Sequence, residues 1–201
     1  MTCAPGGRSL VGDWVRLDPS VADDADGLFA ALDHAQVWEY GYGGGPAGRP
    51  TSPADWVART AAATAEQRAM FTVRLLADDR IVGTSSLGDV DLHNERVHLG
   101  WTAYDPATWS TAVNPECKLL LMTHAFEDCG FGRVKIQTDI INNRSQAAIA
   151  KLGAQREGVL RRHMKRADSS WRDTVVFAVT VDDWPQVKQG LQARLAALAE
   201  R

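Results

Sequence analysis

Residues 96–106 read RVHLGWTAYDP, residues 115–130 read PECKLLLMTHAFEDCG and residues 131–139 read FGRVKIQTD. Apolar side chains alternate in the first and last of these segments, as they do in strands, and the middle segment has the length and composition of a helix closed by a glycine. Two strands joined by a helical crossover are expected to be parallel neighbours with a right-handed connection. The centre of the fold is therefore predicted to be a βαβ unit.

The start of the crossover helix is a candidate anion site. Asn114 is expected to be the N-cap, Pro115 the first helical residue, and Glu116 a partner for the positive end of the helix dipole. The small residues 110–113 leave backbone N–H groups that can point outward and bind a phosphate. An ordinary capped helix is the alternative, since the loop matches neither a Walker A motif nor a dinucleotide fingerprint.

Several of these segments together resemble the GNAT superfamily of acyl-CoA-dependent N-acetyltransferases, in particular the RimJ/RimL type that acetylates ribosomal-protein N-termini. The matching segments are RVHLGW (96–101), TAVNPECKLL (111–120), DIINNRS (139–145), KLG (151–153), GVLRRH (158–163) and RDTVV (172–176). The resemblance implies a GNAT fold of the α/β (α+β) class. It would have one domain over residues 1–201, a central mixed sheet of about seven strands with two splayed parallel strands, and flanking helices.

Composition is that of a globular protein of one domain. The chain has 201 residues, 45% hydrophobic and 23% charged, with a formal net charge of −3. This charge gives no case for nucleic acid as a partner, and no apolar run is long enough for a membrane span. Three cysteines without metal-ligand spacing predict no metal site and, with no signal-like N-terminus, a cytoplasmic location.

Hydrophobic periodicity extends the fold on both sides of the central unit. Residues 1–8 are expected to be a loose tail, and the last segment, 182–200, a helix. The other expected elements are strands at 14–17, 70–76, 80–87, 154–165 and 171–180 and helices at 21–34 and 55–68. The last helix carries an apolar stripe that is expected to dock on the domain, and a homodimer contact is the alternative.

A loop near the N-terminus is predicted to contact the acceptor. Residues 37–46 combine Trp38, Tyr40 and Tyr42 with a run of glycines, which gives contact area on an adaptable backbone. The alternative is that these rings only cover the core. A short acidic connection, Asp89, Asp91 and Glu95, is either solvated or attracts a cationic acceptor.

The resemblance assigns catalytic roles to two residues. His98 stands where family members often have a glutamate that acts through water as the base, and a neutral histidine is a competent base near pH 7. Ser145 matches the position that protonates the leaving thiolate, and Asn142 one that contacts the pantetheine arm. The backbone N–H groups near Trp101 or Thr102 are expected to hold the oxyanion.

The predicted acetyl-CoA phosphate loop departs from the family pattern. The family form is [RQ]-x-x-G-x-[GA], whereas this loop lacks the glycines that let a backbone approach a phosphate closely. Its residues are Trp109, Ser110, Thr111, Ala112, Val113 and Asn114.

These assignments predict an acetyl-CoA-dependent N-acetyltransferase that acts on a primary amine in a ternary complex. The aromatic loop and the acidic connection favour a small cationic amine, such as an antibiotic whose acetylation would give resistance, and a protein N-terminus is the other acceptor. A non-catalytic acyl-CoA sensor and a structural dimerisation domain are the alternatives from other functional classes.

Overall fold

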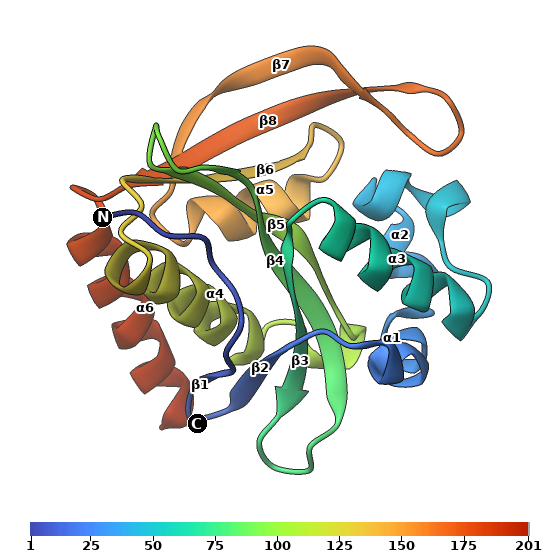
Figure 1. Cartoon of the computed structure of the whole chain (residues 1–201), viewed down its shortest axis with the longest axis horizontal. Helices are drawn as coiled ribbons and strands as arrows, with labels where there is room; N and C mark the ends of the chain where they lie inside the picture. The colour runs from blue at the N-terminus through green and yellow to red at the C-terminus, as the bar shows by residue number, and fades with distance from the viewer. Residues whose placement is uncertain (201) are drawn as a thin grey trace.

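The computed structural model, which describes residues 1–200, contains one eight-stranded mixed sheet with helices on both faces (Figure 1). The strands are β1 (Leu10–Val11), β2 (Val15–Pro19), β3 (Ala69–Leu75), β4 (Ile81–Asp91), β5 (Arg96–Tyr104), β6 (Arg133–Asp139), β7 (Gln155–Lys165) and β8 (Trp171–Thr180). Their order is β1-β2-β3-β4-β5-β6-β8-β7. The predicted α/β class and the parallel central pair, β5 and β6, are confirmed. The additional strand is β1, whose two residues are too few to leave an alternating pattern.

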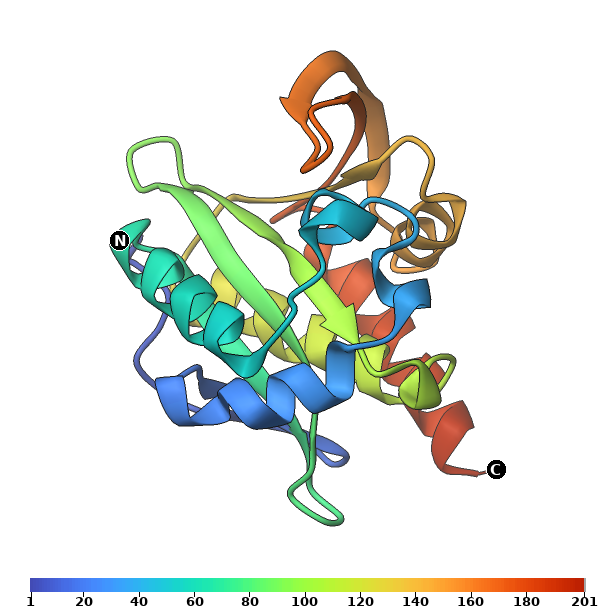
Figure 2. The same cartoon turned by 90° about the vertical axis from the view of Figure 1, so that its right-hand side faces the viewer.

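Helices form a layer on each face of this sheet (Figures 1 and 2). The α-helices are α1 (Ala25–Leu32), α2 (Ala35–Trp38), α3 (Pro53–Ala65), α4 (Val113–Thr123), α5 (Asn143–Ala150) and α6 (Trp184–Ala199). The short helical turns are η1 (Ala22–Asp24), η2 (Tyr42–Gly44), η3 (Pro46–Gly48), η4 (Pro106–Thr108) and the π-helical η5 (His124–Asp128), which extends α4. Helices α1–α3 cover one face, and α4 and α6 cover the other.

The apolar stripe of α6 is buried within the chain itself. Trp184, Val187, Leu191 and Leu195 are 2–6% exposed and belong to the main core cluster, and the ring of Trp184 stacks on Phe126 with centroids 5.2 Å apart. The interpretation that this helix docks on its own domain is therefore confirmed.

Residues 1–8, expected to be a loose tail, lie against the end of the α4–η5 helix. The Cys3 amide donates to the carbonyl of Cys129 at 2.9 Å, and the Thr2 hydroxyl donates to that of Gly130 at 3.1 Å. Gly130 has φ +70°, the left-handed conformation expected of a glycine that ends a helix. The tail therefore satisfies carbonyl groups at this helix end.

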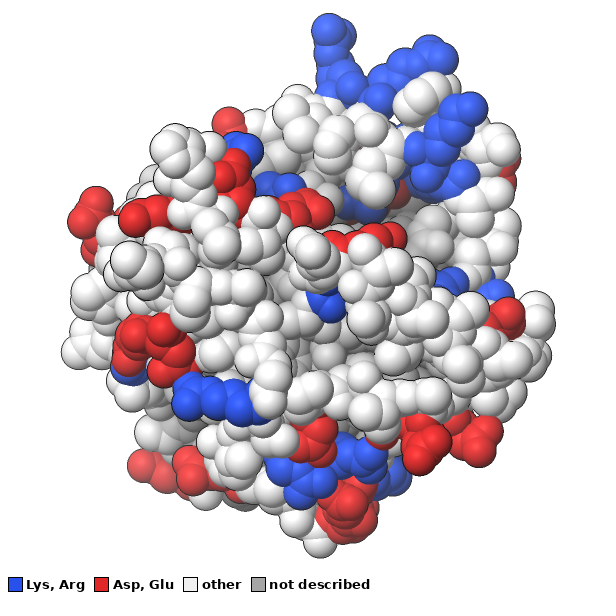
Figure 3. Space-filling view, in the orientation of Figure 1, with Lys and Arg blue, Asp and Glu red and all other residues white. Residues whose placement is uncertain are grey.

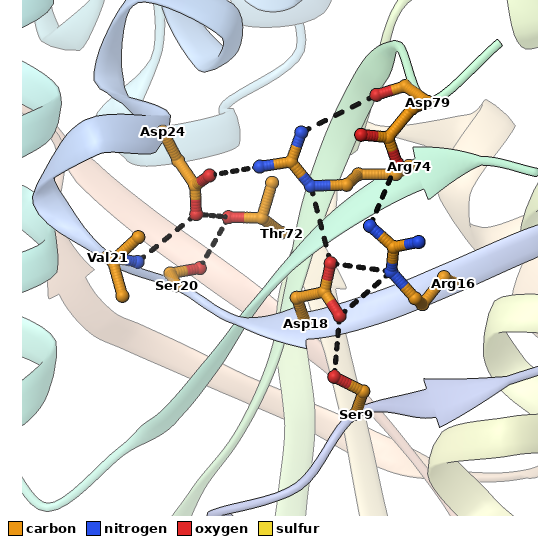
Figure 4. A network of polar contacts seen from close by, with 9 residues as sticks. All are labelled: Ser9, Arg16, Asp18, Ser20, Val21, Asp24, Thr72, Arg74 and Asp79. Atoms are coloured by element: carbon orange, nitrogen blue, oxygen red, sulfur yellow. Dashed lines mark hydrogen bonds and ion pairs between the residues drawn. The ribbon is translucent and has the colours of Figure 1, made fainter.

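A buried polar network fixes the layer of α1 to the sheet (Figure 4). The carboxylate of Asp24, only 3% exposed, accepts hydrogen bonds from the Thr72 hydroxyl at 2.7 Å, from the guanidinium of Arg74 and from the Val21 amide. A buried carboxylate is tolerated only when it is paired in this way. Because Thr72 and Arg74 lie on β3, the network holds α1 in register with the strand.

Candidate active site

The two parallel strands are hydrogen-bonded at one end and separate at the other. Paired residues run only from Arg96 opposite Arg133 to His98 opposite Lys135. Beyond that pair, β5 continues against β4 as far as Tyr104, and β6 continues against β8 as far as Asp139. The facing backbone edges of β5 and β6 therefore diverge after His98, which leaves a slot lined by strand N–H and C=O groups. We call this slot the splay.

A β-bulge shapes the β5 side of the splay. Ser86 pairs with Gly100 and Thr84 pairs with Ala103, so that Trp101 and Thr102 lie opposite the single residue Ser85. Trp101 has φ +50°, a conformation that an L-residue rarely adopts. Bulges turn backbone groups out of the regular ladder, and this one contains Trp101 and Thr102, whose amides are predicted to hold an oxyanion.

The loop before α4 presents backbone donors, although its cap differs from the prediction. Helix α4 begins at Val113 with Ala112 as its N-cap, so the expectation that Asn114 caps the helix was wrong. Ser110 has φ +65°, and the Thr111 hydroxyl donates to the carbonyl of Thr108 at 2.6 Å. Within residues 1–200, no acceptor is found for the N–H groups of Ser110, Ala112 and Asn114. These donors at a helix N-terminus can bind a phosphate without a glycine.

Glu116 holds this helix to the start of the sheet. Its carboxylate, 3% exposed, accepts hydrogen bonds at 2.8 Å from three successive amides, those of Asp13, Trp14 and Val15. Gly12 packs so closely that an added Cβ would lie 2.3 Å from the carboxyl carbon. Glu116 therefore joins α4 to the turn between β1 and β2.

A buried lysine lies beneath the bulge. Lys118 is 5% exposed, and its ammonium Nζ is 2.7 Å from the hydroxyl of Thr102, which is in turn 2.7 Å from that of Ser85. Burial lowers the pKa of Lys118 to about 7, since no carboxylate compensates for the lost hydration. The Thr102 side chain is thus used within the protein, and only its backbone faces the splay.

His98, the residue predicted to be the base, lies at the closed end of the splay, at the last pair of the parallel strands. Its Nδ1 is 3.2 Å from the carboxylate of Asp89, which also accepts from Lys135 at 2.9 Å. The hydrogen bond from His98 holds the pKa of Asp89 well below its usual range, so Nδ1 carries the proton. Burial lowers the pKa of His98, although Asp89 opposes this effect. The other nitrogen, Nε2, keeps its lone pair and is buried without a hydrogen-bond partner among residues 1–200.

The three aromatic rings of the 37–46 loop have different surroundings. Trp38 is fully buried, and its indole N–H donates to the carbonyl of Leu32 at 2.8 Å, which is the core-covering role. Tyr40 is 40% exposed. The ring of Tyr42 packs against that of Trp38 at a tilt of 56°, and its hydroxyl is 3.4 Å from the carbonyl of Trp101 at the bulge. Burial raises the pKa of Tyr42 to about 12. Tyr42 is therefore the ring closest to the splay.

An ion pair that the sequence did not reveal supports this loop. Asp139, at the end of β6, is paired in a bidentate manner with Arg166 of the β7–β8 turn at 2.8 and 2.9 Å. Gly41 packs on Asp139, and the Ala167 amide donates to the carbonyl of Gly44 at 3.0 Å. Two segments more than 120 residues apart in the sequence thus form one wall. We call residues 37–46 and the β7–β8 turn the acceptor wall.

Helix α5 brings the other predicted residues to the open end of the splay. The Asn142 side chain accepts from the Ser145 amide at 2.9 Å and caps the helix, and the half-buried Ser145 lies in the first turn. The guanidinium of Arg144 lies 3.6 Å from the ring centroid of Trp109, whose indole N–H donates to the Tyr104 carbonyl. This cation–π contact bridges the segments that follow β5 and β6.

The sequence and the fold both match known acetyltransferases. Residues 15–155 match the family model for an acetyltransferase (GNAT) domain. The chain belongs to the GNAT acetyltransferase family. A GCN5-related N-acetyltransferase from Brucella melitensis is 27% identical, with a TM-score of 0.88 over 96% of this chain and 88% of that one. A protein from T. thermophilus, described as an acetyltransferase, is 31% identical, with a TM-score of 0.82 over 97% of this chain and 100% of that one. No curated protein matches.

The GNAT fold is also shared with Mycobacterium smegmatis RimJ in complex with CoA-disulfide. That structure is 21% identical to this chain, with a TM-score of 0.74 over 93% of this chain and 94% of the other. As a member of the GNAT family, this chain is an acetyltransferase. Among residues 1–200, no helix is long and apolar enough to cross a membrane, and no group of three metal-ligating side chains comes together.

Proposed function

We propose that this protein is an acetyl-CoA-dependent N-acetyltransferase that acts on a primary amine by direct attack in a ternary complex. The observation that carries the proposal is the neutral His98 at the closed end of the splay, with its lone-pair nitrogen free of any partner. A base at this point removes the proton that the amine loses as it attacks a thioester lying in the splay. The bulge amides and the α4 loop supply the donors that an oxyanion and a phosphate require.

The reaction balances within this site. The amine nitrogen forms a bond to the thioester carbon, and the carbon–sulfur bond breaks when the tetrahedral intermediate collapses. One amine proton goes to Nε2 of His98. The departing thiolate takes a proton from a hydroxyl, for which Ser145, on the first turn of α5, is our candidate. Water then returns a proton to the serine oxygen, and the imidazolium of His98 releases one to water, so both side chains regain their starting states.

The surroundings of the splay favour a polypeptide N-terminus over a polycationic small molecule. Two of the three acidic residues that suggested a cationic acceptor are already paired, since Asp89 binds His98 and Lys135, and Asp91 binds Arg96. Lys and Arg side chains also gather over the β7–β8 hairpin (Figure 3). The exposed basic residues there include Arg161, Arg162 and Lys165. A polycation that approached the acceptor wall would be repelled by these charges.

Thiol release from acetyl-CoA, measured against a panel of amines, tests the proposal. We expect turnover with peptides that carry a free N-terminus and little with polyamines or aminoglycosides. Turnover with an aminoglycoside alone would replace the proposed acceptor with an antibiotic. Acetyl-CoA binding by calorimetry without turnover of any amine would support the alternative, a non-catalytic acyl-CoA sensor.

A further inference from the structure

Three buried polar atoms that have no hydrogen-bond partner in the described part of the chain lie on one face of three adjacent strands. They are Nε2 of His98 on β5, Oε1 of Gln137 on β6 and Nε of Arg172 on β8. The pairings of His98 with Lys135 and of Asp139 with Thr174, together with strand alternation, place all three side chains on the face covered by α1–α3. Buried polar groups are normally satisfied, so orphans gathered on one face indicate a ligand.

Gln137 lies level with the reacting nitrogen of His98. Gly100 and Gln137 are each two residues beyond the last hydrogen-bonded pair of the parallel strands, His98 and Lys135. The His98 ring leans over Gly100, because a Cβ added there would lie 2.5 Å from Nε2. His98 Nε2, which lies over Gly100, and the side chain of Gln137 therefore belong to level positions on the two sides of the splay, and both Nε2 and the Gln137 oxygen can accept hydrogen bonds.

Arg172 adds a donor further from the slot. It lies on the same face as Asp139, whose negative charge raises the pKa of the Arg172 guanidinium while burial lowers it more. Arg172 lies two residues beyond Thr174, the partner of Asp139, so its backbone is four residues along the sheet from Gln137, which corresponds to about 13 Å. The guanidinium Nε is thus suited to a carbonyl oxygen that lies roughly three or four residues from the amine in an extended peptide.

We propose that His98 and Gln137 together bind the two N–H bonds of a primary amine at the splay, and that Arg172 binds a backbone carbonyl oxygen of the same acceptor peptide. This assignment rests on the proposed acetyltransferase function and names its substrate class, a polypeptide with a free primary N-terminus. Two acceptors fix both N–H bonds and leave the nitrogen lone pair to point into the splay. A secondary amine offers one N–H bond too few.

The acceptor reaches these atoms when the 37–46 loop moves aside. Both acceptors are buried, and Gly41 covers the same face beside Gln137 by packing on Asp139. Gly41, Gly43, Gly44 and Gly45 all have φ between +57° and +95°, so this loop has the backbone freedom to rearrange. Among the described residues, the hydrogen bond that joins this loop to the bulge is a long one, 3.4 Å between the Tyr42 hydroxyl and the Trp101 carbonyl.

Gln137→Met and Gln137→Glu test the role of Gln137. The first removes the acceptor oxygen at similar size, and the second keeps it. With a peptide acceptor we expect Gln137→Met to lower kcat/KM about 10- to 100-fold, the range for one unsatisfied buried partner. Gln137→Glu should recover most of that loss. Discrimination between a primary N-terminus and its N-methyl form should fall in Gln137→Met. Gln189→Met, the same exchange at an exposed site on α6, serves as the control.

Arg172→Met extends the test to the carbonyl contact. It should lower kcat/KM for a peptide about tenfold and leave a simple alkylamine unchanged, whereas Gln137→Met should weaken both. Acetyl-CoA affinity, measured by calorimetry, should be unchanged in every variant. Equal kcat/KM and equal N-methyl discrimination in wild type and Gln137→Met would overturn the inference and leave the acetyltransferase function standing. Wild type that acetylates no amine would instead overturn the function.

Discussion

The two walls of the splay are built in different ways. The cofactor wall is made of the bulge and the loop before α4, which lie within residues 101–118 and present mainly backbone N–H groups. The acceptor wall and the residues beneath it come from β5, β6, α2, η2 and the β7–β8 turn, and present side chains. A backbone surface suits a co-substrate shared across a family, whereas a side-chain surface can change with each acceptor.

Breaking the ion pair beneath the acceptor wall should have the largest effect. Asp139→Ala leaves the largely buried Arg166 without its carboxylate, and loss of one partner of such a pair costs about 3–5 kcal/mol. We expect the free energy of unfolding, measured by urea titration, to fall by that amount and the urea midpoint to fall with it. Asp78→Ala, which removes an exposed carboxylate beside Arg80, is the control. An unchanged midpoint for Asp139→Ala would show that the pair contributes nothing to the wall.

Beneath the cofactor wall, Lys118 should make stability depend on pH. Its pKa is lowered to about 7 in the folded protein from an ordinary value of 10.5. Between these values the unfolded chain binds the proton and the folded chain does not, so stability falls as pH decreases from 10.5 to 7. Relative to Lys118→Met, wild type should gain roughly 3 kcal/mol between about pH 7 and about pH 10. Parallel pH curves for the two proteins would contradict this assignment.

Loss of the His98 side chain should slow the chemical step. His98→Ala removes the base, and we expect kcat/KM to fall about 100-fold or more. Because burial holds the pKa of His98 below its ordinary 6.5, wild type should lose activity only on the acid side of that value, and the variant should lack this limb. Acetyl-CoA affinity should not change. If His98→Ala still lost activity on the acid side of its pH profile, the base would be another group.

The smallest effect should come from the contact between α5 and the cofactor wall. Arg144→Ala removes the cation–π contact with Trp109, which is worth about 0.5–1 kcal/mol at an exposed site. We expect a change of roughly two- to fivefold in the acetyl-CoA dissociation rate, with little change in stability. Stopped-flow measurement with Arg194→Ala, on α6, as the control would check this. Identical rates would place Arg144 outside the path of the cofactor.

The same contrast explains what the sequence could predict. The βαβ unit and the loop before α4 lie in one continuous stretch, so the pattern was sufficient to identify them, although it misplaced the cap at Asn114. Gln137, Arg166 and Arg172 carry no motif, and they become neighbours only through strand order and register. Whether such a side chain finds a hydrogen-bond partner depends on how the strands and turns pack, which the sequence pattern does not show. The role of Glu116 was missed for a similar reason, since its carboxylate is engaged by three distant amides.

The three hydrogen bonds of Glu116 give the beginning of the chain a mechanical link to the cofactor loop. The turn at Asp13–Val15 is tied to the first turn of α4, the helix whose start faces the splay. A tag or truncation that displaces β1 would therefore also shift the backbone N–H groups before α4, because the Glu116 carboxylate connects the two segments. Preparations that differ only at the N-terminus should be compared for acetyl-CoA affinity before any difference between them is assigned to the acceptor.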